Sequence, residues 1–157
     1  MNIPLPDIDE IDRRILDVLQ QNARISNHEL AQKVGLSASP CWRRMRRLEK
    51  MGVIRGYATV LDAARLGLPV TAIAMVTLDD HHPDTVATFD EAVNRLPEIL
   101  DCMAISGEHD YLLRILAPGM DSYQRFLADH LLQVPGIRSV NTVFALKHNK
   151  QTTAIPL

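Results

Sequence analysis

The hydrophobic pattern of this chain changes its period near Leu66, and this change limits what the chain can fold into. Before it, apolar residues recur every three to four positions, which is the spacing of one face of an α-helix. After it, runs such as VTAIAMVTL at 70–78 have the length and composition of buried β-strands. We therefore expect an α+β protein with two domains in series, over residues 1–62 and 63–157.

The first domain begins with two short helices. The first helix follows a cap at Asp7 or Asp9, and its apolar face is formed by Ile11, Ile15, Val18 and Leu19. Ser26 and Glu29 have the spacing of a capping box, which predicts the start of a second helix. Gly35 is expected to end that helix.

A third helix is expected to follow after a short turn. Ser39 is its predicted N-cap, and Pro40 suits the first helical position. Cys41, Met45 and Leu48 form an apolar stripe, so the remaining long side chains point mostly outward: Trp42, Arg43, Arg46, Arg47 and Lys50. Three helices of this kind, followed by strands at 53–57 and 58–61, have the layout of a winged helix-turn-helix.

The charge of the chain is unevenly distributed. Residues 1–62 hold ten Lys and Arg against eight Asp and Glu, whereas residues 63–157 hold seven against eleven. A basic helix in a mildly acidic protein favours double-stranded DNA as a partner, because cations and helix N-terminal groups contact phosphates. A solvated helix face is the simpler alternative. The candidate DNA-binding residues are Arg24, Ser37, Ser39, Pro40, Trp42, Arg43, Arg46 and Arg47. For Trp42, packing against the second helix is favoured over DNA contact.

The second domain contains two consecutive βαβ patterns. Strands are expected at 70–78, 99–106, 111–117 and 137–146, and helices at 84–95 and 121–132. The order β-α-β-β-α-β is that of the ferredoxin-like motif. Its sheet has one face that its own two helices do not cover, and this face is expected to pair with a second copy of the chain.

Three segments in order make the chain resemble the Lrp/AsnC family of bacterial feast/famine transcriptional regulators. They are IDEIDRRILDVLQQNARIS, LAQKVGLSASPCWRRMRRLEKMGVIRGY and SGEHDYLLRI. The resemblance implies a winged helix-turn-helix followed by a ferredoxin-like, ACT-like effector domain. It also implies an amino-acid effector bound at a subunit interface, and dimers that associate into tetramers or octamers.

The resemblance places the effector at the turn between the central strands, formed by Ser106, Gly107, Glu108, His109, Asp110 and Tyr111. Gly107 allows a positive φ, and Asp110 offers a carboxylate to an ammonium group. An ordinary β-turn would use the same residue types. The chain departs from many members after Gly107 and at His109. Its ending, FALKHNKQTTAIPL, resembles members that sense cysteine or branched-chain amino acids, which implies a small uncharged effector.

The sequence favours no catalytic residues, no metal site and no cofactor. Cys102, His109 and Asp110 lack the ordering of a nucleophile triad, and the doublet His81–His82 is typical of a solvated loop. No apolar run is long enough to span a membrane, and the first residues lack the cations of a signal peptide, so a cytoplasmic location is expected. Two rival functions remain: an enzyme or regulatory subunit of amino-acid metabolism, and a nonspecific architectural DNA-binding protein.

Overall fold

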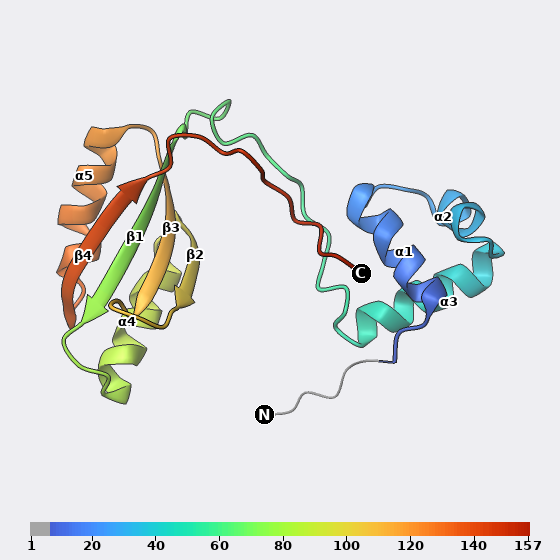
Figure 1. Cartoon of the computed structure of the whole chain (residues 1–157), viewed down its shortest axis with the longest axis horizontal. Coiled ribbons are helices and arrows are strands. Elements are labelled where there is room, and N and C mark those ends of the chain that lie inside the picture. The colour runs from blue at the N-terminus through green and yellow to red at the C-terminus, as the bar shows by residue number, and fades with distance from the viewer. Residues whose placement is uncertain (1–6) are drawn as a thin grey trace. The chain divides into compact units, whose positions relative to one another are not determined.

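The computed structural model describes residues 7–157 and divides into two compact units (Figure 1). The helical unit comprises the residues up to Val60 together with Lys150–Leu157, and the sheet unit comprises Leu61–Asn149. The predicted second domain, 63–157, includes the last eight residues, whereas in the structure these eight residues group with the helices. None of the described helices is long and apolar enough to cross a membrane.

The helical unit contains α1 (Glu10–Gln21), α2 (Asn27–Val34) and α3 (Ala38–Lys50). Asp9 caps α1 in a capping box with Asp12, and Ser26 caps α2 in the predicted box with Glu29. Gly35 ends α2 at φ 73°, in the left-handed region where glycine avoids the clash of a Cβ atom. One face of each helix meets in a common core formed by Ile15, Leu16, Leu19, Leu30, Ala31, Val34, Cys41 and Leu48.

The start of α3 and the wing differ from the prediction. The N-cap is Ser37 instead of Ser39, so Pro40 occupies the third helical position, where its missing N–H costs no helical hydrogen bond. The two strands predicted at 53–57 and 58–61 are absent from the described chain. The amides of Val53 and Ile54 instead bond back to the Leu48 carbonyl, and the residues that follow up to 61 are exposed.

The sheet unit has the predicted order of elements. These are β1 (Val70–Leu78), α4 (Pro83–Arg95), β2 (Ile99–Ala104), β3 (Tyr111–Ala117), α5 (Met120–Asp129), the 3₁₀ turn η1 (Leu131–Gln133) and β4 (Ile137–Phe144). The strands form one antiparallel sheet in the order β2-β3-β1-β4, which is the ferredoxin-like arrangement. The predicted α5 breaks into α5 and η1, and β2 and β4 each end two residues early.

The two faces of the sheet are unlike. Alternate β1 and β3 residues, such as Ala74 and Leu113, are fully buried beneath Phe89 of α4 and Phe126 of α5. Because side chains alternate along a strand, the neighbouring residues point to the other face, which neither α4 nor α5 covers (Figure 1). The apolar members of this open face are Ile73, Met75, Met103, Leu112, Leu116 and Val143.

Candidate nucleic-acid interface and effector turn

The exposed side of α3 presents a row of polar and cationic residues. Ser39, Arg43, Arg46 and Lys50 are all exposed and recur at the spacing of one helix face, opposite the buried Cys41 and Leu48. Within residues 7–157, Arg43 and Lys50 form no ion pair with a carboxylate. The outward orientation predicted for these side chains is therefore confirmed.

Trp42 and Arg46 form a separate pair beside this row. The Trp42 side chain is 51% exposed, and the Arg46 guanidinium lies 5.8 Å from the centre of its ring, within the range of a cation–π contact. Arg46 also bonds to Glu49 at 2.8 Å. Half of the residue faces solvent beside Arg46, so Trp42 is not the mainly buried residue on which the favoured packing interpretation depends.

Two other arginines of α3 are directed toward α1. The Asp12 carboxylate is fully buried, and it accepts from Arg44 Nη1 at 2.9 Å and from Arg47 Nη2 at 2.5 Å. Arg44 also contacts Asp9 at 2.6 Å, an interaction that raises the pKa of the Arg44 guanidinium. Arg47 is 45% exposed, yet one of its donors is committed to a buried acid. It is thus a fold-stabilising residue as well as a candidate DNA contact.

The N-terminal end of α3 is open. Ser37 makes no side-chain cap bond, so within residues 7–157 the first-turn amides of Ala38 and Ser39 lack a capping side chain. The end of a helix binds anions such as phosphate because these amides and the helix dipole point toward it. Arg24 lies exposed in the segment between α1 and α2.

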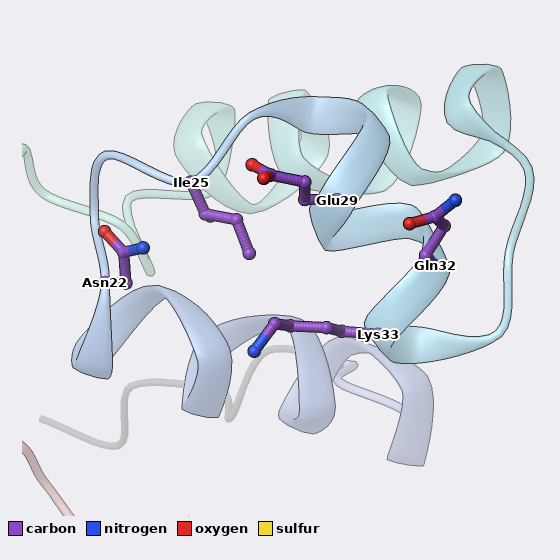
Figure 2. A pocket seen from close by; sticks show the side chains of 5 residues that line it. All are labelled: Asn22, Ile25, Glu29, Gln32 and Lys33. Atoms are coloured by element: carbon purple, nitrogen blue, oxygen red, sulfur yellow. The ribbon is translucent and has the colours of Figure 1, made fainter.

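A hollow of about 370 Å³ lies beside α2, away from these residues. It is lined by Asn22, Ile25, Glu29, Gln32 and Lys33 (Figure 2). Figure 2 shows that the side chains come from α2 and from the segment that joins it to α1, and not from α3. Glu29 is held by the Ser26 hydroxyl at 2.8 Å. None of the predicted site residues lines this hollow.

The second predicted site, the turn at 106–110, is closed by backbone hydrogen bonds. The Ile105 amide donates to the Asp110 carbonyl, and the Asp110 amide donates to Val76 on β1. Gly107 has φ 124°, so the predicted positive φ is confirmed. Ser106, Gly107 and Glu108 are exposed, and they form the tip of the turn.

The side chains that flank this tip point in different directions. His109 Nδ1 lies 3.0 Å from Thr77 Oγ1, which belongs to the open face of the sheet. Tyr111 points to the helix-covered face, where its ring centre lies 4.5 Å from that of Phe89. The turn therefore brings Ser106 to Asp110 together, whereas the Tyr111 ring belongs to the core of the sheet unit.

Asp110 fastens the turn to the end of β1. Its Oδ2 accepts from the Leu78 amide at 2.8 Å, and its Oδ1 lies 2.8 Å from His81 Nε2. The Leu78 hydrogen bond, together with His81, lowers the pKa of the Asp110 carboxyl. The His81 side chain is 72% exposed, so Oδ1 faces a partner that a ligand can displace, whereas Oδ2 is held by backbone.

We expect Asp110→Ala to destabilise the sheet unit by about 1–2 kcal/mol at pH 7, because it leaves the Leu78 amide without its acceptor. The depressed pKa means that the stabilisation by Asp110 is present above the unfolded-state pKa of about 4 and is lost as pH falls through the folded-state value. Urea unfolding followed by circular dichroism should show a gap between wild type and variant that closes below about pH 4. An unchanged gap at pH 3 would contradict a role for the charged form.

Sequence reasoning missed two contributors to these sites, Asp12 and His81. Asp12 stands three residues before Ile15 and seven before Leu19, on the buried face of α1. An acid inside an apolar stripe indicates a buried ion pair, so this signal was present in the sequence. His81 carried no comparable signal, because its contact with Asp110 depends on how the strands pair.

Comparison with known proteins agrees with both parts of the fold. Residues 71–155 match the Lrp/AsnC ligand binding domain family, and residues 8–55 match a winged helix-turn-helix DNA-binding family. The transcriptional regulator AzlB of Bacillus subtilis is 39% identical over 150 residues, which cover 96% of each chain. The leucine-responsive regulatory protein of Escherichia coli is 40% identical over 152 residues, 97% of this chain and 93% of that one.

Solved structures show the same likeness along the whole chain. The transcriptional regulator NMB0573 of Neisseria meningitidis, solved as a complex with L-Met, has a TM-score of 0.92 and 38% identity, covering 95% of this chain and 96% of that one. An AsnC family regulator of Agrobacterium tumefaciens has a TM-score of 0.90 and 36% identity, covering 95% and 97%. The chain therefore belongs to the Lrp/AsnC family of transcriptional regulators.

Proposed function

We propose that this regulator binds specific DNA sites through α3 and that a small, uncharged amino acid modulates the binding. The observation that carries the proposal is the exposed row Ser39, Arg43, Arg46 and Lys50. Arg46 pairs with Glu49, whereas Arg43 and Lys50 have no carboxylate partner within residues 7–157. Arginine reads guanine bidentately and lysine contacts phosphate, so this row suits the major groove. The open N-terminus of α3 adds amides for a phosphate.

The effector is assigned to the turn at 106–110. Positive φ at Gly107 lets a ligand approach the backbone closely, and Asp110 Oδ1 accepts from an α-ammonium group once His81 is displaced. The only acids of the turn are Asp110 and Glu108. If both hold the α-ammonium group of the effector, no carboxylate of the turn is left to pair with a cationic effector side chain such as that of lysine. Leucine and methionine, which the names of two similar proteins mention, join cysteine, isoleucine and valine as candidates.

The open face of the sheet is assigned to a second copy of this chain. Two of its six apolar residues, Met103 and Val143, are 49% and 51% exposed. Covering this apolar surface with a second copy removes it from water, which is favourable. The same face also holds an ion pair, in which Arg114 contacts Asp101 at 2.6 Å. A two-fold interface must be complementary to itself, and a face that holds both members of an ion pair meets a copy of itself without net repulsion.

A footprint with and without amino acid tests the proposed function. We expect a bounded protection with two half-sites separated by about one helical turn or a multiple of it, because a two-fold dimer presents two recognition helices. Leucine or methionine should change its extent or the affinity, and lysine should not. Uniform coverage of every fragment would indicate an architectural protein, and no protection would contradict DNA binding altogether.

A further inference from the structure

The last residues of the chain dock onto α1, although they follow the sheet unit in sequence. The Gln20 side-chain amide donates from Nε2 to the Ile155 carbonyl at 3.1 Å, and its Oε1 accepts from the Ile155 amide at 2.7 Å. One side chain thus satisfies both backbone groups of one residue, as a neighbouring β-strand would. Gln20 lies in the last turn of α1, beside the buried Leu19.

The local sequence prepares Ile155 for this contact. Ile155 precedes Pro156, and a residue before proline is restricted to extended conformations by the proline ring. Three residues before Ile155, the Thr152 hydroxyl accepts from the Ala154 amide at 3.1 Å, within the same segment. An extended backbone with free N–H and C=O groups is the form that a side-chain amide can bond on both sides.

This docking joins the two units through a second segment of chain, whose end is held to the helical unit by hydrogen bonds. The chain leaves the helical unit after Val60, forms the sheet unit, and returns to the helical unit at Lys150. A single linker would leave the helical unit free to reorient about one segment. With Ile155 bonded to α1, any reorientation must move the segment before Lys150 as well.

We infer that residues 150–157 act as a strap that restrains the helical unit, and that the partner of the strap is Gln20 of α1. A restrained unit loses less orientational freedom on binding DNA, so the strap favours affinity and links α3 to the effector unit. This functional consequence rests on the proposed function, whereas the docking itself does not.

The single tryptophan allows a direct test in the full-length chain. Trp42 lies in α3, so its fluorescence anisotropy decay reports the rotation of the helical unit. We expect Gln20→Ala, which removes both hydrogen bonds, and Ile155→Pro, which removes the amide donor, to add a faster rotational component. Each lost bond should raise the undocked fraction roughly fivefold. Gln21→Ala, at the exposed neighbouring position, is the matched control and should decay as wild type does.

Hydrogen exchange of the C-terminal peptide supplies the second measurement. Exchange at 150–157 should be faster in Gln20→Ala and Ile155→Pro than in Gln21→Ala. Unchanged exchange in Gln20→Ala would overturn the docking, and faster exchange with an unaltered Trp42 decay would overturn the restraint. Neither measurement uses DNA, so a wild-type protein that fails to footprint would contradict the proposed function and leave the strap intact.

Discussion

Asp12→Ala is expected to lower the free energy of unfolding of the helical unit by about 3 kcal/mol, near the lower end for a broken buried ion pair. The carboxylate is fully buried and joins α1 to two arginines of α3. Its loss leaves Arg44 and Arg47 without their shared acceptor and also removes half of the capping box with Asp9. Because these arginines are 30% and 45% exposed, water recovers part of the loss.

Urea unfolding monitored by Trp42 fluorescence measures this effect, because the tryptophan lies in α3. Asp17→Ala is the matched control: the same residue type, on the exposed face of the same helix. Asp12→Asn should fall between wild type and alanine, since an amide keeps the shape and one acceptor but not the charge. Equal stability of Asp12→Ala and Asp17→Ala would show that the pair contributes nothing net.

The pattern of periodicities predicted most of the fold for a physical reason. Apolar residues recur every three to four positions in a helix and every two positions in a strand. The buried residues follow these two spacings, as Ile15 does in α1 and Ala74 in β1. Capping residues likewise act locally, so Ser26 and Gly35 were assigned correctly. The strands β1 and β3 match their predicted bounds because turn residues or polar residues stop them at both ends.

What the sequence did not predict depends on contacts between distant segments. Arg43 and Arg47 look equivalent in a helix pattern, yet Arg47 turns to Asp12 on another helix. The wing strands require a pairing partner that residues 53–61 do not find in the described chain. The final residues carry no hydrophobic period at all, so their docking on Gln20 was invisible before the fold was known.

The same division shapes the candidate sites. The turn at 106–110 was predicted from Gly107 and Asp110, whose backbone requirements are local. That Asp110 bonds to Leu78 on one side and to His81 on the other follows from the register of β1 against β3, in which Val76 pairs with Tyr111. Residue types therefore indicated the turn, and strand pairing decided that one Asp110 oxygen is held by backbone while the other faces His81.

Arg43→Ala should weaken binding to the footprinted site by about 10- to 100-fold, the cost of one lost base or phosphate contact, with unfolding unchanged. Arg43 is exposed at the centre of the α3 row and has no carboxylate partner in residues 7–157, so removing it affects only DNA. Arg47→Ala should lower both affinity and stability, because it also removes one of the two arginine partners of the buried Asp12. Anisotropy titrations at several salt concentrations separate the two kinds of contact. A phosphate contact reduces the slope of log K against log salt by about one on every sequence, whereas a base contact relaxes specificity at one position.

Arg125→Ala, which removes a cation of α5 in the sheet unit, is the control for net charge. Wild-type affinity in Arg43→Ala would remove α3 from the interface with DNA.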